Sequence, residues 1–154
     1  FKMNPPLRNR DDREALLAGL LDGTIDMIAT DHAPHSAEEK AKGLRGSAMG
    51  VVGIETAFPL LYTYLVETGK MPLEMLIDRM AAAPRRRFRI DGGMQVGDKA
   101  AVTVFDLHAR EKIDPNTFLS KGRATPFEGW KVHAACRLTI CGDKIAYNAL
   151  SRKE

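Results

Sequence analysis

Residues 5–83 contain one clear core strand, over about residues 24–30, among three predicted helices. The helices cover about residues 12–22, 54–66 and 72–82, and each has apolar residues at helical spacing. A second strand is present only if Phe1–Asn4 forms the end of one. One or two parallel strands can neither close into a barrel nor cover their own edges. We therefore expect this part of the chain to be a portion of a larger α/β fold.

Proline and glycine mark the ends of these helices. Asn9–Asp12 offer N-cap residues for the first helix, and Gly23 can end it in the left-handed conformation. Pro59 suits a helix only near its first turn or at a kink, and Pro84 is expected to end the third helix. The side chains expected to face inward are Ala57, Leu60, Leu61, Tyr64, Leu65, Leu73, Leu76, Ile77 and Met80.

The C-terminal part has the pattern of short antiparallel strands. Ala100–Phe105 is β-branched and is predicted as a strand. Leu138–Ile140 and Lys144–Tyr147 are predicted to pair as a hairpin, because Gly142-Asp143 between them is a favourable two-residue turn. The stretch 112–130 before the hairpin is rich in Pro, Gly and Asn and is predicted to be mainly loop.

The change in pattern occurs near Gly92-Gly93. We therefore place a boundary around residues 90–96. It divides the chain into an N-terminal portion, residues 1–93, that belongs to the larger α/β fold, and a small antiparallel β portion, residues 94–154.

The charge balance gives little support to a nucleic-acid function. The chain has 23 Lys and Arg against 20 Asp and Glu, with a net charge of +3. The basic cluster Arg85–Arg89 is better explained as a solvated loop after a helix than as a nucleic-acid patch. With one Trp and three Tyr, a platform for stacking bases is not expected either. We expect no nucleic-acid partner.

The cysteines and the apolar pattern bear on location. Cys136 and Cys141 form no CxxC motif and would face opposite sides of one strand, so neither a disulfide nor a zinc knuckle is expected. No apolar run approaches the roughly 20 residues needed to span a bilayer, and the N-terminus has no signal-peptide pattern. These features favour a cytoplasmic protein without a membrane partner. The first residue is Phe1 rather than Met, which hints at a truncated chain.

Polar residues gather where the predicted strand ends. Asp31, His32 and His35 follow it directly, and Asn4 lies about one βα unit earlier in the chain. In barrel enzymes the catalytic groups gather at this rim, because several strand ends converge there. Taken singly, Asp31 also suits an N-cap and Asn4 a turn before proline. Together the residues indicate a metal-assisted hydrolase.

The strand-end residues offer an incomplete zinc site. A carboxylate at such a rim can ligate zinc and take a proton from a metal-bound water, which makes Asp31 the candidate. His32 and His35 could also ligate, but a catalytic zinc requires at least three protein ligands, so this chain alone is not expected to form one. His35 could instead bind a substrate carboxylate, as could the amide of Asn4. The polar stretch 36–50 beside them is either a functional lid or a plain surface loop.

Three motifs together resemble those of bacterial dihydroorotases of class I. They are Lys2–Arg8 (KMNPPLR), Ile28–His35 (IATDHAPH) and Gly50–Leu60 (GVVGIETAFPL). Ser120–Gly129 (SKGRATPFEG) fits as well, and the match spans nearly the whole chain in order.

The related dihydropyrimidinases and allantoinases differ from this pattern at two positions. They usually have another residue where Asn4 stands, and they lack a histidine like His35. Both positions suit a substrate with a carboxylate next to the ring, which favours dihydroorotase.

The resemblance implies the C-terminal part of an amidohydrolase TIM (β/α)8 barrel with a small antiparallel β-sandwich portion. It implies a zinc centre, commonly binuclear, and the reversible cyclisation of N-carbamoyl-L-aspartate to L-dihydroorotate in de novo pyrimidine biosynthesis. Asp31 would be a zinc ligand and the catalytic proton shuttle, which passes a proton to the ring nitrogen. Asn4 and His35 would bind the substrate, and the backbone around Met49 and Gly50 would contact the ring.

Several family features are absent or altered. The His-x-His pair, the bridging acidic or carboxylated-lysine ligand, two later histidines and the substrate arginine normally precede the matched segment, and none is in this chain. Met49, Ala83 and Ala101 stand where the family often has an aromatic residue, Asn and Asp, respectively. We predict that this chain alone is inactive and binds zinc poorly.

Two other functions stay open from the sequence. One is a non-catalytic dihydroorotase-like subunit that scaffolds aspartate carbamoyltransferase, although retention of Asp31, Asn4 and His35 argues against it. The other is a different cyclic amidohydrolase, a dihydropyrimidinase or allantoinase. The expected partners are a small-molecule substrate, a second copy in a homodimer of the full-length protein, and aspartate carbamoyltransferase.

Overall fold

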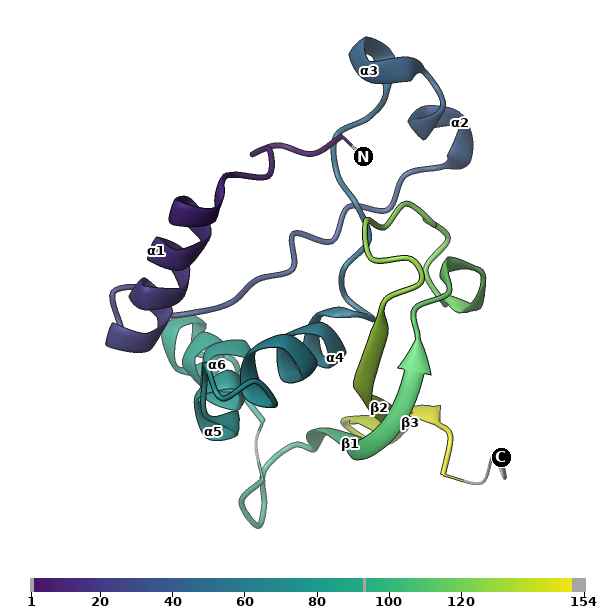
Figure 1. Ribbon diagram of the computed structural model, residues 1–154. Helices are drawn as coiled ribbons and strands as arrows, with labels where there is room; N and C mark the ends of the chain where they lie inside the picture. The colour runs from purple at the N-terminus through teal and green to yellow at the C-terminus, as the bar shows by residue number, and fades with distance from the viewer. Residues whose placement is uncertain (1, 93, 151–154) are drawn as a thin grey trace.

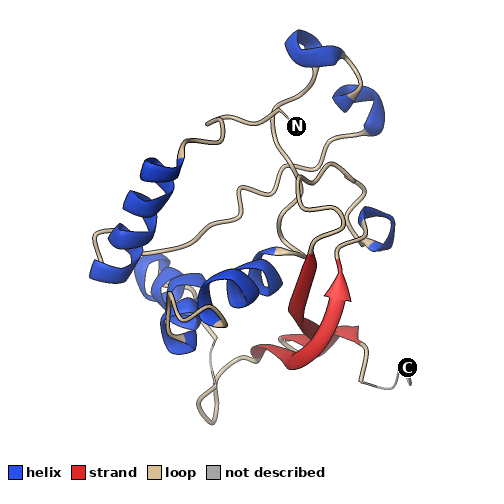
Figure 2. Ribbon diagram, viewed as in Figure 1, coloured by secondary structure: helices blue, strands red, loops and turns tan. Residues whose placement is uncertain are grey.

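The computed structural model describes residues 2–92 and 94–150. Helices form the first part of the chain and a three-stranded antiparallel sheet forms the last, as Figures 1 and 2 show. No helix in these two ranges is long and apolar enough to cross a membrane. The structure is therefore a small α/β unit, with its helices and its sheet in the order that the sequence predicts.

Helix α1, Arg10–Asp22, has both predicted ends. The Asn9 side chain caps its start by accepting a hydrogen bond from the Asp12 amide at 2.9 Å. Gly23 follows its last residue with φ of 88°, the left-handed conformation that glycine adopts without strain. No residue of α1 is buried, and Leu16 is 56% exposed. The described residues therefore cover the apolar face of α1 only in part.

The prediction of a strand over residues 24–30 is wrong. Its residues run as an extended segment between α1 and the next helix, drawn as a loop in Figure 2. One backbone bond fixes its middle, from the Ile28 amide to the Arg79 carbonyl at 3.0 Å. An extended segment becomes a strand only when a neighbour completes its ladder, and no described segment lies in that place. The alternative second strand, Phe1–Asn4, includes Phe1, which is outside the described residues.

The polar stretch after residue 35 is more regular than a loop. It contains two short helices, α2 at Ala37–Lys40 and α3 at Gly43–Gly46. Ser36 caps α2 with a full capping box, in which its side chain accepts from the Glu39 amide and the Glu39 carboxylate accepts from the Ser36 amide.

The second predicted helix begins later than expected and widens. Helix α4, Ala57–Leu61, continues into a π-helical turn, η1, Tyr62–Val66. Pro59 lies in the first turn of α4, where its missing N–H has no intrahelical partner to lose. Leu60 is buried as predicted. Tyr64 is 39% exposed, because the wider π-helical turn rotates its side chain away from the protein core.

The third predicted helix does not end at Pro84. Helix α5, Leu73–Ile77, continues through a π-helical turn, η2, Asp78–Ala82, into α6, Ala83–Phe88. Pro84 occupies the first turn of α6, which tolerates proline, and the basic cluster therefore begins on a helix rather than in a loop. Leu76 is fully buried as predicted, whereas Ile77 is 48% exposed.

The sheet has the order β1-β2-β3, with all neighbours antiparallel. Its strands are β1, Ala101–Lys112, β2, Lys131–Cys141, and β3, Lys144–Asn148. The predicted hairpin is confirmed, with Cys141 opposite Lys144 and Gly142 at φ of 65° in the turn. Strand β1 is longer than predicted, because it pairs with β2 on both sides of two irregularities.

Both cysteines are free, as predicted. The loop between β1 and β2 contains one short 3₁₀ helix, η3, at Pro115–Thr117. The predicted boundary falls at Gly93, outside the described residues, and the division into 1–93 and 94–154 stays a prediction.

The helices pack on the sheet through α4 and η1. Leu60 forms a buried cluster with Ile113 and Val132, and Phe118 and Phe127 pack against it. At the edge of the cluster, the His133 amide donates to the Thr63 hydroxyl at 2.8 Å. This core fixes the sheet and the following loop relative to the helical part.

The loop between β1 and β2 also packs on residues 31–35 and 50–55, the strand-end region, where the strand predicted over residues 24–30 would end. The Glu55 carboxylate accepts from the amides of Leu119 and Ser120, both at 2.9 Å. The Val52 amide donates to the Ala124 carbonyl at 2.9 Å. Between these contacts Gly122 is buried, and a Cβ there would lie 2.8 Å from the Cα of Pro34 and 2.9 Å from a methyl group of Val52.

We expect Gly122→Ala to lower the free energy of unfolding by about 1–3 kcal/mol, because the added methyl group overlaps backbone that cannot easily move. Urea denaturation of the two proteins measures the difference. Lys121→Ala, an exposed neighbour, is the control and should change the value by less than about 0.5 kcal/mol. Equal values for the two variants would mean that the loop does not pack on Pro34.

The lowered pKa of Asp106 on β1 leads us to predict that stability depends on pH. Hydrogen bonds from the His108 amide and the Arg137 guanidinium hold the pKa of its carboxyl below the usual value. The interactions that lower this pKa stabilise the folded state while the carboxyl is ionised. Their contribution is fully present above the unfolded-state pKa, about 3.9, and is lost as the pH falls through the folded-state pKa. Asp106→Asn should therefore be less stable than the wild type at pH 6 and approach it below about pH 4. Thermal unfolding across this range tests the prediction, and a constant difference would contradict it.

Candidate functional site

Asp31 lies where the extended segment turns. It is exposed, and its φ of 46° is in the left-handed region that Asp adopts more readily than most residues. Two residues later, the Ala33 amide donates to the Val51 carbonyl at 3.0 Å. That bond fixes the backbone just after Asp31 and leaves its carboxylate free to face a ligand.

His32 supports the turn that starts the next helix. Its Nδ1 accepts from the amides of Gly53 and Ile54 at 3.1 and 3.3 Å, so this nitrogen is unprotonated. His32 thus connects residues 31–35 to residues 53–54.

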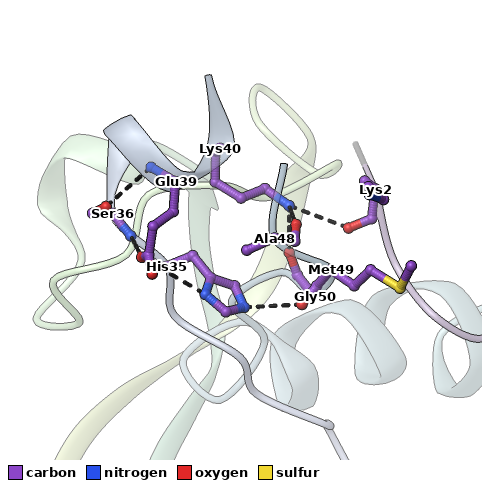
Figure 3. Close-up of polar contacts among 8 residues, drawn as sticks. All are labelled: Lys2, His35, Ser36, Glu39, Lys40, Ala48, Met49 and Gly50. Carbon is purple, nitrogen blue, oxygen red and sulfur yellow. Dashed lines mark hydrogen bonds and ion pairs between the residues drawn. The ribbon is translucent and has the colours of Figure 1, made fainter. Parts of the chain in front are cut away.

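His35 lies against the backbone of Met49 and Gly50 (Figure 3). Its Nε2 is 2.9 Å from the Met49 carbonyl, to which it donates, and its Nδ1 is 3.8 Å from the Glu39 carboxylate. Hydrogen bonds from the backbone and side chain of Ser36 hold the pKa of Glu39 below its usual value, with a smaller effect of the charge on His35. Nε2 of His35 is thus committed to Met49, and Nδ1 faces the Glu39 carboxylate.

Gly50 is required by this packing. Its φ of 126° is one that residues with a side chain rarely adopt, and a Cβ there would overlap the Cβ of Ala33. The same Cβ would lie 3.4 Å from Nε2 of His35. The absent side chain lets residues 33–35 and 49–50 approach closely.

Asn4 is brought to the same region by its neighbour Lys2. The Lys2 carbonyl accepts from the Gly50 amide at 2.9 Å and from the Lys40 ammonium at 3.2 Å. Asn4 itself is exposed. The structure thus brings His35, Met49 and Gly50 into direct contact and holds the segment of Asn4 beside them. Asp31 is connected to this group through its neighbours His32 and Ala33, which bind the backbone of residues 51–54.

The described residues do not form a metal centre by themselves. Nowhere in residues 2–92 and 94–150 do three His, Cys, Asp or Glu side chains come together as a metal site. Of the remaining histidines, His133 pairs with Glu67 at 2.7 Å and His108 is exposed on β1. Asp31 is the one carboxylate at the strand end, so the residues present do not fit a complete zinc site.

Sequence reasoning missed two lysines at this site. Lys2 and Lys40 donate hydrogen bonds to backbone carbonyls across the strand-end region. A lysine in a charged, polar stretch usually indicates a solvated surface, and no local sequence pattern distinguishes a lysine that binds carbonyls.

Comparison with known proteins gives a consistent assignment. The model of the amidohydrolase family matches residues 4–146. A dihydroorotase from Anoxybacillus flavithermus is 55% identical over 148 residues, and one from Bacillus cereus strain AH820 is 56% identical. These matches cover 96% of this chain but 35% of each relative, so the chain spans about a third of their length.

Solved structures of hydantoinases have the same fold. An L-hydantoinase (dihydropyrimidinase) from Arthrobacter aurescens superposes with a TM-score of 0.86 at 31% identity, over 96% of this chain and 34% of that one. A D-hydantoinase (dihydropyrimidinase) from Thermus sp. gives 0.85 at 27% identity, over 97% and 34%. Because the family model matches residues 4–146 of its 154 residues, the chain belongs to the amidohydrolase family.

Proposed function

We propose that this chain forms the C-terminal part of a dihydroorotase, which cyclises N-carbamoyl-L-aspartate to L-dihydroorotate reversibly. The observation that supports this most strongly is the 55–56% identity to proteins named dihydroorotase over nearly the whole chain. The two hydantoinases, whose fold matches this chain with TM-scores of 0.85–0.86, are 27–31% identical. Because the chain spans about a third of its relatives, the activity belongs to the longer protein and not to this portion alone.

The fold of the longer protein would be a TIM barrel with a small β-sandwich, to which residues 1–93 and 94–154 contribute. Two features support this proposal. The apolar face of α1 is only partly covered, with Leu16 56% exposed, and no described segment forms a ladder with the extended residues 24–30. Both are expected of a barrel portion whose neighbouring strands and helices come from other residues.

Asp31 would be the catalytic carboxylate. Its exposed position at the end of the extended segment leaves it free to accept a proton and return it to the ring nitrogen of the substrate. Asn4 and His35 would bind the substrate carboxylate, from two segments that the structure holds beside each other. The backbone of Met49 and Gly50, which His35 contacts, would face the ring.

A zinc site in the longer protein would include Asp31 as one ligand. The described residues do not fit a complete site, so the further ligands would have to come from outside this chain. Homodimer formation, association with aspartate carbamoyltransferase and a cytoplasmic location are parts of the proposal that rest on the family resemblance.

The decisive experiment measures turnover by the full-length protein that contains this chain. We expect it to act on L-dihydroorotate and not on hydantoin or dihydrouracil. Asp31→Ala should lower kcat/KM by a factor of roughly 10²–10⁴, because it removes the group that transfers the proton. Metal analysis of the same variant should show reduced zinc content.

Asp143→Ala is the control, since Asp143 is an exposed carboxylate in the turn between β2 and β3, outside the proposed site. It should retain wild-type turnover. Turnover of hydantoin without turnover of dihydroorotate would favour a hydantoinase and overturn the proposal. Near-normal activity of Asp31→Ala would refute the role of Asp31.

A further inference from the structure

Lys40 at the end of α2 donates to three backbone carbonyls. Its ammonium lies 2.8 Å from the carbonyls of Ala48 and Gly50 and 3.2 Å from that of Lys2 (Figure 3). An ammonium has three N–H donors, so its capacity is filled. None of the ion pairs formed by the described residues includes Lys40. Its charge is therefore stabilised by carbonyl dipoles and not by a carboxylate.

The three carbonyls belong to the two segments proposed to contact the substrate. Ala48 and Gly50 lie on either side of Met49, whose own carbonyl accepts from His35. Three successive carbonyls, at residues 48–50, are thus held by two side chains. The third acceptor of Lys40, the Lys2 carbonyl, lies two residues before Asn4.

Lys2 joins the same two segments through its own side chain. Its ammonium donates to the carbonyls of Arg45 and Ser47 at 3.0 and 2.9 Å, while its own carbonyl accepts from Lys40. The Ser47 hydroxyl, in turn, donates to the Lys40 carbonyl at 2.8 Å. The two lysines connect the segment of Asn4 to the segment of Met49 from both sides.

We propose that Lys40 is a positioning residue that holds the backbone of Met49 and Gly50 at a fixed place relative to Asn4, so that both can bind one substrate. This inference rests on the proposed function. Lys40 does not touch the substrate, and it acts through the carbonyls that it binds. Without its ammonium, partly buried carbonyls on both segments lose their charged donor.

Lys40→Met tests the proposal in the full-length protein, because methionine keeps an unbranched side chain and removes the donors. We expect KM for dihydroorotate to rise about tenfold, while kcat falls less than about threefold. The reason is that the variant loses substrate binding equally in the ground state and in the transition state, which raises KM and leaves kcat nearly unchanged. Lys42→Met is the matched control, since Lys42 is exposed in the same stretch and caps nothing with its side chain. It should behave as the wild type.

Chemical rescue separates positioning from a general loss of structure. In Lys40→Ala, n-propylammonium replaces the deleted atoms and should restore a large part of the lost affinity. Tetramethylammonium has no N–H donor and should restore none. A failure of n-propylammonium to rescue a folded variant, or a KM of Lys40→Met within twofold of Lys42→Met, would overturn the proposal.

Amide hydrogen exchange gives a readout that does not depend on activity. Residues 48–52 should exchange at least about tenfold faster in Lys40→Met than in Lys42→Met, because the loss of a charged donor loosens this backbone. Equal exchange in the two variants would overturn the positioning role. If the wild type lacks dihydroorotase activity, the proposed function fails, and the exchange experiment still decides whether Lys40 holds this segment.

Discussion

The backbone of residues 50–53 is the point on which the rest of the structure depends. Three segments that are far apart in the sequence form hydrogen bonds with it: the Gly50 amide binds the Lys2 carbonyl, the Ala33 amide binds the Val51 carbonyl, and the Val52 amide binds the Ala124 carbonyl. Val51 and Val52 are buried, so these bonds are shielded from water. The N-terminal segment, the strand end and the loop from the sheet therefore meet at one place, and each proposed substrate contact lies within a few residues of such a bond.

The candidate site is held mainly through main-chain atoms. His35 binds the Met49 carbonyl, His32 binds the Gly53 amide, and Lys40 binds the Ala48 and Gly50 carbonyls. Close approach is achieved by leaving out a side chain at Gly50, where a Cβ would overlap Ala33. A site built in this way fixes the backbone of residues 48–53 before any ligand binds, and pre-organisation of this kind lowers the entropy lost on binding. Asp31 is the exception, because its exposed carboxylate is not part of this network.

Local signals in the sequence predicted the local structure well. Asn9 and Gly23 end α1 as expected, and Gly142-Asp143 forms the predicted hairpin turn, because capping and turn geometry depend on a few adjacent residues. The predictions that failed depended on distant neighbours. Residues 24–30 have the composition of a strand but no ladder partner in the described part of the chain. The extra residue in the π-helical turn η1 changes which side of the helix Tyr64 occupies.

The sequence by itself determined the family, the residue types available for chemistry and the order of helix and sheet. Motifs and caps are short, and they can be identified without knowing what packs against them. The tertiary structure decided that Nε2 of His35 is committed to Met49, that His32 supports a turn, and that Lys40 connects two segments of the candidate site. These contacts join residues up to 38 positions apart. The conformation of the whole backbone, and not the identity of either residue, determines whether such donors and acceptors come within hydrogen-bonding distance.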